Sequence, residues 1–225
     1  CVSEAIGLAL PGSAGAPAPY ESRDEYAYHS GRVVMDLIRD NLRPRDILTR
    51  KAFENAATVV AASGGSTNAG LHLPALAAEC GIEFDLHDVA EIFKRTPYIA
   101  DLKPGGKYVA RDLFAVGGVP ILMKALMEGG FLHGDCITVT GKTIAENLED
   151  VVFPEDQDVV YKTSAPLSPT GGVVGLRGNL APEGAIVKVA GMKKLQFTGP
   201  ARCFDCEEDA FKAVEKRDYK EGEVL

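Results

Sequence analysis

The sequence lacks the features that mark several large classes of protein. No stretch approaches the roughly 18 consecutive apolar residues of a membrane-spanning helix, so no such helix is expected. No run of Lys and Arg is longer than Lys193–Lys194 and the formal net charge is −8, which argues against a nucleic-acid or anionic-membrane surface, since such a surface needs a basic patch. The first residues lack a basic segment ahead of an apolar one, so no secretory signal peptide is predicted.

The sequence also lacks a cysteine pattern typical of a disulfide framework or a metal site. Five cysteines lie at positions 1, 80, 136, 203 and 206, and this odd count with wide spacing favours a reducing compartment. Cys203 and Cys206 have CxxC spacing, but a structural zinc site needs a second ligand pair, which is absent. We interpret them as incidental thiols, with a redox-active pair as the alternative. The chain is therefore predicted to hold no metal of its own.

Apolar residues at helical spacing dominate the sequence up to about residue 150. Ser22 and Glu25 match a capping box, and Thr49 and Asp85 are predicted to cap two further helices. One predicted helix begins at Ser22. The others cover 49–62, 66–81, 86–95, 119–127 and 143–148, and a β-like run lies at 137–140. This part of the chain is predicted to be mostly helical.

The character of the sequence changes after this helical part. Residues 153–172 are rich in Pro, Ser, Thr and Gly and have no apolar period, which is typical of a linker or crossing loop. The β-type runs that follow are 173–176, 185–190, 195–198 and 223–225, with one helix at about 206–217. We predict an α/β fold with one domain in 1–152, a linker in 153–172 and the start of a second, β-rich domain in 173–225.

The segment 64–69, Gly-Gly-Ser-Thr-Asn-Ala, joins two predicted helices. Paired glycines allow a sharp turn or a close approach of backbone to ligand. The helix start that follows offers free N–H groups, which suit a carboxylate or a phosphate. Ser66, Thr67 and Asn68 add short polar side chains, and they are our candidate substrate-binding residues.

The same segment has a purely structural interpretation. Ser or Thr after glycines is commonly the N-cap of a helix. On this reading Ser66 or Thr67 caps a helix that reaches about Cys80, with Leu73, Leu76 and Ala77 on its buried side. Residue pattern alone leaves both interpretations open.

Seven collinear segments carry a resemblance to a known family. They are LALPGSAGAPAPY (8–20), GGSTNAGLHL (64–73), DLKPGGKYV (101–109), GGVP (117–120), LHGDCITVTGKTIAENL (132–148), GNLAPEGAIVKVAG (178–191) and FTGPARCFD (197–205). In order and spacing they resemble the dihydroxy-acid/6-phosphogluconate dehydratase family. The likeness is strongest to its members in branched-chain amino-acid synthesis.

The resemblance implies a cytoplasmic hydro-lyase that converts a 2,3-dihydroxy acid into a 2-oxo acid for valine and isoleucine synthesis. It implies an iron–sulfur cluster, [2Fe–2S] or [4Fe–4S], a magnesium ion, and a homodimer or homotetramer. It also implies that 1–152 is the latter part of an α/β N-terminal domain and that 173–225 opens a barrel-like C-terminal domain.

The sequence departs from the family pattern in one large respect. The family's cluster cysteines, magnesium ligands and catalytic serine match no position between Cys1 and Leu225. We therefore expect an internal piece of a longer protein that, alone, has no catalytic residue, binds neither cluster nor magnesium and is inactive. Two alternatives stay open: a dehydratase of a sugar acid or its 6-phosphate, for which Arg50 and Lys51 are the cations nearest the glycine pair in sequence, and a non-catalytic fragment.

Overall fold

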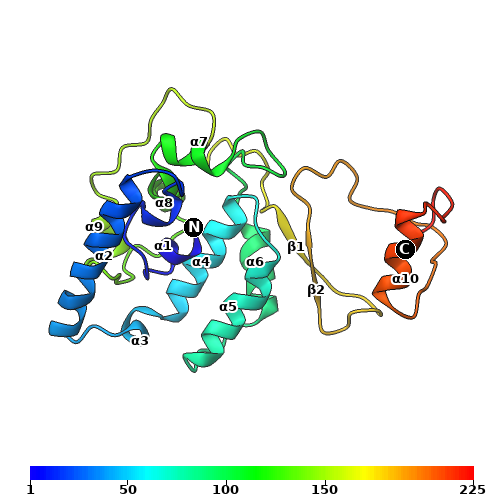
Figure 1. Ribbon diagram of the computed structural model, residues 1–225, viewed down its shortest axis with the longest axis horizontal. Coiled ribbons are helices and arrows are strands. Elements are labelled where there is room, and N and C mark those ends of the chain that lie inside the picture. The colour runs from blue at the N-terminus through cyan, green and yellow to red at the C-terminus, as the bar shows by residue number, and fades with distance from the viewer. The chain divides into compact units, whose positions relative to one another are not determined.

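The computed structural model describes residues 1–225, which fold into two compact units, Cys1–Gly191 and Met192–Leu225 (Figure 1). The larger unit combines helices with one two-stranded antiparallel sheet, and the smaller unit contains one helix. The predicted α/β class is therefore confirmed. A barrel-like arrangement of strands is not observed, because the sheet has only two strands.

The larger unit contains nine α-helices, a short 3₁₀ turn at Ser13–Gly15 and two strands. The helices are α1 Val2–Ala5, α2 Ser22–Arg39, α3 Pro44–Ile47, α4 Arg50–Ala62, α5 Asn68–Glu79, α6 Leu86–Arg95, α7 Ala110–Ala115, α8 Gly118–Glu128 and α9 Ile144–Asn147, and the strands are β1 Val173–Leu176 and β2 Ala185–Lys188. None of these helices combines the length and apolar composition needed to cross a bilayer.

Side-chain caps set the start of three helices where the sequence predicts them. The Oγ1 atom of Thr49 accepts from the N–H of Ala52 at 3.3 Å, so α4 begins at Arg50. Asp85 accepts from the N–H groups of His87 and Asp88 at the start of α6. These bonds satisfy backbone donors that have no partner within the helix. Thr143 starts α9 in the same way.

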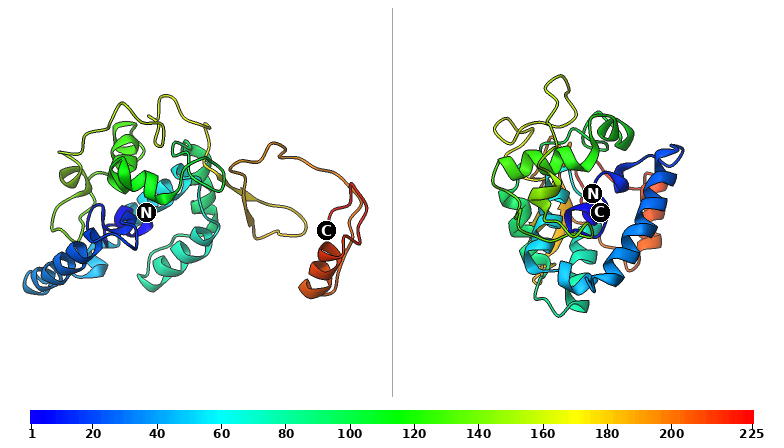
Figure 2. Two further views of the ribbon diagram at one scale, coloured as in Figure 1. Left: turned by 45° about the horizontal axis from the view of Figure 1, so that its top comes forward. Right: turned by 90° about the vertical axis from the view of Figure 1, so that its left-hand side faces the viewer.

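The predicted cap of α2 is wrong. The residue before the helix is Glu21, and neither its side chain nor that of Ser22 forms a cap bond. Backbone turns replace the cap, since the N–H groups of Arg23 and Asp24 donate to the carbonyls of Tyr20 and Glu21. Both Figure 1 and Figure 2 show α2 at the outside of the larger unit, and none of its residues is fully buried.

Three of the predicted β-type runs do not form strands, among them 223–225, where a single bridge joins Val224 to Ala201. In 137–140 the chain turns back on itself, with the N–H of Thr138 donating to the carbonyl of Lys142, and a single bridge joins Ile137 to Thr143. Residues 195–198 form no strand either. A β-like composition produces a strand only where a partner strand supplies the hydrogen bonds.

The core of the larger unit surrounds α4, in which ten of the thirteen residues are buried. One side of α4 packs with α1 and α8, and the other side packs with α5 and α6 (Figure 1). The segment without helix or strand at 153–172 also reaches this core through Val159 and Val160, which are 4% and 1% exposed. Backbone bonds hold it there, because Asp101 donates to Val159 and Tyr161 donates to Ile99.

The two strands form a hairpin that lies against α6 and the end of α4. Val173 pairs with Lys188 at one end of the ladder, and Leu176 pairs with Ala185 at the other. A Cβ atom at Gly175 would lie 2.3 Å from that of Ala90, so the strand backbone touches α6 directly. The hairpin is thereby fixed next to the turn that follows α4.

The smaller unit is built around α10, Glu207–Glu215, within the helix predicted at 206–217. Ala213 is its only buried residue, whereas Phe211 and Val214 are exposed. Arg202 pairs with Asp218 at 2.9 Å, and one bridge joins Ala201 to Val224.

Candidate functional site

A glycine turn follows α4 and leads into α5. Gly64 and Gly65 have φ angles of 85° and 71°, a left-handed conformation that residues with a Cβ rarely adopt. Space is limited as well, since a Cβ atom at Gly65 would lie 2.4 Å from Cγ2 of Val173 and one at Gly64 would lie 3.0 Å from the ring of Tyr98. The turn therefore requires glycine at both positions for two independent reasons.

The three candidate binding residues lie directly after this turn and are all exposed. Thr67 is the N-cap residue of α5, but its side chain forms no cap bond. The alternative in which the Thr67 side chain caps this helix is therefore wrong. The Oγ atom of Ser66 accepts from the N–H of Asn68 at 3.3 Å, which is a partial cap. The helix ends at Glu79 with Cys80 as its C-cap, which confirms the predicted end at about Cys80, and Gly81 follows in the left-handed conformation.

The buried side of α5 differs from the prediction in one residue. Leu73 and Ala77 are buried, but Leu76 is 46% exposed. Leu76 lines a cleft of about 670 Å³ that also contains Gly65 and Ser66. We call this cavity the GGSTN cleft, and its lining residues are Cys1, Val2, Ser3, Ile6, Leu8, Leu48, Val60, Ser63, Gly65, Ser66, Leu76, Leu102, Lys103 and Lys188.

Two lysines in the lining give the GGSTN cleft a positive charge. Lys188 is the last residue of β2, and its Nζ atom donates to the carbonyl of Gly65 at 2.7 Å. Lys103 lines the cleft from the segment after Ile99. No acidic side chain lines the cleft. The arrangement is suited to a small organic anion with an apolar portion.

Sequence reasoning missed both lysines. Lys188 is the single charge at the end of the apolar run Ala185–Val187, and Lys103 lies within the DLKPGG segment. The one feature of the sequence that could have indicated Lys188 is a charged residue at the end of an otherwise apolar strand. Nothing local says that such a charge faces a turn 123 positions earlier in the chain.

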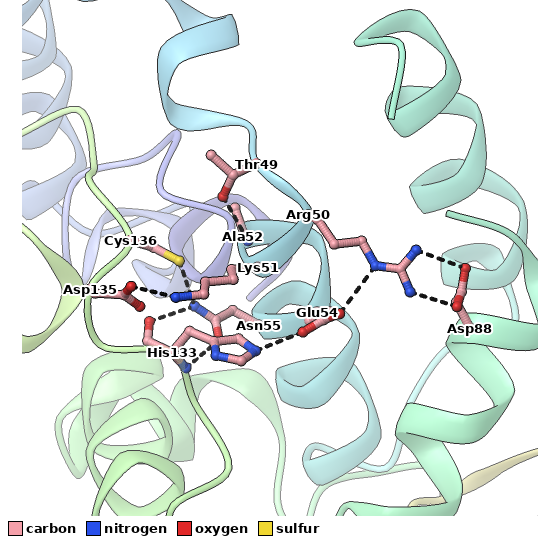
Figure 3. Close-up of polar contacts among 10 residues, drawn as sticks. All are labelled: Thr49, Arg50, Lys51, Ala52, Glu54, Asn55, Asp88, His133, Asp135 and Cys136. Carbon is pink, nitrogen blue, oxygen red and sulfur yellow. Dashed lines mark hydrogen bonds and ion pairs between the residues drawn. The ribbon is translucent and has the colours of Figure 1, made fainter. Parts of the chain in front are cut away.

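Arg50 and Lys51, the cations nearest the glycine pair in sequence, lie at the other end of α4. The thirteen residues of α4 put about 20 Å between them and the turn. Both are ion-paired, as Figure 3 shows: Arg50 with Asp88 at 2.6 Å and Glu54 at 3.1 Å, and Lys51 with Asp135 at 2.5 Å. Neither is available to an anion in the GGSTN cleft.

The same end of α4 holds a buried amide that ties two segments together. Asn55 is fully buried; its Nδ2 donates to the carbonyl of His133 at 3.0 Å, and its Oδ1 accepts from the N–H of His133 at 2.8 Å (Figure 3). The ring of His133 also contacts Glu54 at 2.7 Å. The role of His133 is therefore structural.

The carboxylates of this polar network have low pKa values despite partial burial. Burial raises the pKa of Glu54, but hydrogen bonds from Arg50 and His133 outweigh it and leave that pKa below its ordinary value. Burial also raises the pKa of Asp88. Hydrogen bonds from Arg50 and from the N–H of Asp85 lower it by more, so this pKa too is below its ordinary value. Both groups are ionised at neutral pH; Asp88 joins α6 to α4 through Arg50, and Glu54 joins α4 to His133.

The donor groups of this chain fit neither an iron–sulfur cluster nor a magnesium ion. No three His, Cys, Asp or Glu residues lie close enough together to hold a metal. Cys136 is buried, accepts from Nδ2 of Asn55 at 3.6 Å, and has its pKa raised by burial, which opposes a thiolate. Cys1, Cys203 and Cys206 are exposed and free.

Fold and cleft together describe an α/β protein suited to bind a small organic anion. Comparison with family models is more specific: the dihydroxy-acid/6-phosphogluconate dehydratase N-terminal model matches residues 1–147, and the C-terminal model of the same family matches residues 158–225. The chain belongs to the dihydroxy-acid/6-phosphogluconate dehydratase family.

Curated relatives match along the whole chain. It is 72% identical to a dihydroxy-acid dehydratase of Parvibaculum lavamentivorans and 73% identical to dihydroxy-acid dehydratase 2 of Bradyrhizobium diazoefficiens, each over 100% of this chain and 39% of the relative. A dihydroxy-acid dehydratase of Sulfurisphaera tokodaii is 52% identical over 100% of this chain and 40% of its own length. The chain thus spans about two fifths of the curated relatives that it matches.

Proposed function

We propose that this chain forms part of a hydro-lyase that removes water from a 2,3-dihydroxy acid to give a 2-oxo acid, in valine and isoleucine synthesis. The observation that carries the proposal is the match, at 72–73% identity over the whole chain, to relatives named dihydroxy-acid dehydratase. The sugar-acid alternative loses its expected support, because Arg50 and Lys51 are held in ion pairs away from the GGSTN cleft.

We propose that Ser66, Thr67 and Asn68 form one wall of the substrate site. They are exposed, they follow two left-handed glycines, and Ser66 lines the GGSTN cleft. Their polar atoms are the right type to contact a carboxylate or a hydroxyl group. The weak cap at Ser66 supports this reading, since a side chain committed to the helix start would be less free to contact a ligand.

The cofactors of the proposed enzyme lie outside the residues described here. We place the iron–sulfur cluster and the magnesium ion in those parts of the relatives that this chain does not span, because its own donor groups do not fit them. A homodimer or homotetramer and a cytoplasmic location are part of the proposal on the family resemblance alone.

The proposed domain organisation is 1–152, a crossing segment in 153–172, and 173–225. The gap between the two family models, 148–157, lies next to this boundary and supports it. The crossing segment has no helix or strand, which also agrees with the proposal.

Enzyme assays on two preparations test the function. A full-length protein that contains this sequence should bind iron and convert a branched 2,3-dihydroxy acid into its 2-oxo acid, whereas the 225-residue chain alone should do neither. 6-Phosphogluconate serves as the competing substrate. Turnover of 6-phosphogluconate in preference to the dihydroxy acid, or stoichiometric iron with turnover by the chain alone, would contradict the proposal.

A further inference from the structure

The hairpin of β1 and β2 joins the two family-matched parts of the chain at the glycine turn. Both strands lie in the part matched by the C-terminal model, 158–225, and the turn lies in the part matched by the N-terminal model, 1–147. All of these residues belong to one compact unit, Cys1–Gly191. The contacts between hairpin and turn are therefore contacts between the two family-matched parts inside one folded unit.

Glycines let the hairpin approach the turn and the start of α5 closely. A Cβ atom at Gly65 would lie 2.4 Å from Cγ2 of Val173 in β1. A Cβ atom at Gly70, in α5, would lie 2.9 Å from Cδ1 of Ile186 in β2. Neither contact leaves room for a side chain on the glycine, so the hairpin determines where the turn and the first residues of α5 lie.

Lys188, the last residue of β2, bonds to the turn itself. Its Nζ atom donates to the carbonyl of Gly65 at 2.7 Å, and such a charge-assisted bond is stronger than one between neutral groups. The N–H groups of Val189 and Ala190 both donate to the carbonyl of Gly172, which fixes the end of β2. The ammonium group thus reaches the turn from a support that is itself hydrogen-bonded.

This bond fixes more of the turn than the carbonyl that accepts it. The carbonyl of Gly65 and the N–H of Ser66 belong to one planar trans peptide unit, in which they point in opposite directions. Gly65 has no Cβ to restrict its dihedral angles, so this unit could rotate if nothing held its carbonyl. The bond from Lys188 therefore sets the direction in which the chain enters Ser66 and continues into α5.

We propose that Lys188 is a positioning residue, whose bond to the carbonyl of Gly65 holds the glycine turn in the orientation in which Ser66, Thr67 and Asn68 meet the ligand. The part of the chain matched by the C-terminal model thereby sets the binding wall that the other part carries. This inference rests on the proposed function and deepens it by naming a residue that acts on the ligand through the turn.

Hydrogen exchange of the full-length protein, followed by mass spectrometry, tests whether Lys188 holds the turn. Native protein should protect the amides of Ala69 and Gly70, which donate to the carbonyls of Ser66 and Thr67 and close the first turn of α5. Lys188→Met removes the donor and should speed the exchange of these two amides by about tenfold or more. Lys188→Arg keeps a charged donor and should restore an exchange rate close to the native one.

Kinetics separates action through the turn from direct contact with the ligand. In the same full-length protein, Lys188→Met should raise KM for 2,3-dihydroxy-3-methylbutanoate by about tenfold and change kcat less, because the displaced groups bind the substrate. In a Ser66→Ala/Thr67→Ala/Asn68→Ala background the same substitution should no longer raise KM, since the wall through which Lys188 acts has been removed. A lysine that contacts the ligand itself would raise KM in both backgrounds.

Lys94→Met, on an exposed lysine of α6, is the matched control and should leave exchange and KM unchanged. Native exchange rates in Lys188→Met would overturn the inference, as would faster exchange without a rise in KM, or an equal rise in KM in both backgrounds. Native protein whose Ala69 and Gly70 amides exchange as fast as those of an unstructured peptide would overturn it even if the variant failed to fold.

The exchange measurement needs no turnover, so it separates this inference from the proposed function. Native protein that protects the turn and loses that protection in Lys188→Met, but dehydrates no 2,3-dihydroxy acid, would count against the proposed function alone.

Discussion

The cations near the two ends of α4 differ in whether carboxylates lie next to them. At its N-terminal end Arg50 and Lys51 are paired with three carboxylates, and Asn55 satisfies both backbone groups of His133. At its C-terminal end a left-handed glycine turn adjoins the cleft that Lys103 and Lys188 line, and no acidic residue lines that cleft.

This difference separates groups that stabilise the fold from groups available to a ligand. Charges that are already paired at the first end gain nothing from an added anion. Charges without a carboxylate partner at the second end would gain charge-assisted hydrogen bonds from one. The proposed function therefore belongs to the C-terminal end of α4, and the predictions below test whether the two ends differ as described.

The largest effect is expected from Gly65→Ala at the turn. A left-handed conformation costs a residue with a Cβ about 1–2 kcal/mol, and the 2.4 Å contact with Val173 adds an overpacking cost of about 1–3 kcal/mol. We expect a loss of roughly 3 kcal/mol in the free energy of unfolding, measured with urea. Gly81→Ala is the matched control, because Gly81 has the same φ of 71° and no atom within 4 Å of an added Cβ. Equal losses in the two variants would show that the turn tolerates the contact.

Removal of the buried amide at the opposite end should have the next largest effect. Asn55→Leu leaves the N–H and the carbonyl of His133 without their partners, at a cost of about 2 kcal/mol or more in unfolding free energy. Asn68→Leu, at an exposed site, should change it by less than about 0.5 kcal/mol. A loss at Asn55 no greater than that at Asn68 would mean that the paired end contributes little to stability.

Replacement of Arg50 should have a smaller effect that depends on pH. Arg50→Met removes partly exposed ion pairs, worth about 1 kcal/mol or less at pH 7. The pKa values of Asp88 and Glu54 are lowered in the fold, so their stabilisation is present above the unfolded-state pKa values and is lost as pH falls through the folded ones. The difference from native protein should shrink between pH 7 and pH 3 in urea unfolding. Arg45→Met, which removes an exposed arginine, should show no such trend.

Limited trypsin digestion tests the segments that lie outside the core around α4. Composition alone predicts the first cut within 153–172, yet Val160 and Tyr161 beside Lys162 are held by burial and a backbone bond. We expect the first cut at Lys193 or Lys194, which are exposed and outside any helix or strand. Mass spectrometry of early fragments would show the site, and an earlier cut at Lys162 would contradict this expectation.

Local signals were enough for several elements. The capped start at Asp85 and the helical spacing over 86–95 predicted α6 with its observed bounds, and the apolar run at 173–176 predicted β1. The prediction of α6 succeeded because the bonds of its cap join residues two or three positions apart, whereas β1 also needed a partner strand 9 to 15 positions away. Ser22 failed as a cap because a backbone turn from Tyr20 already satisfied the first donors of α2.

For the candidate site, the sequence by itself determined the glycine turn, the polar residues after it and the family. Glycine adopts the left-handed conformation without the steric cost that a Cβ imposes, so a glycine pair after a helix is a local signal for the turn. Only the tertiary structure decided which cations face the turn: Arg50 and Lys51 are near it in sequence but lie along a rigid helix from it, whereas Lys188 is 123 positions from Gly65 and is brought to it by the hairpin packed on α6. Long-range packing sets that contact, because the side chain carries no local preference for its partner.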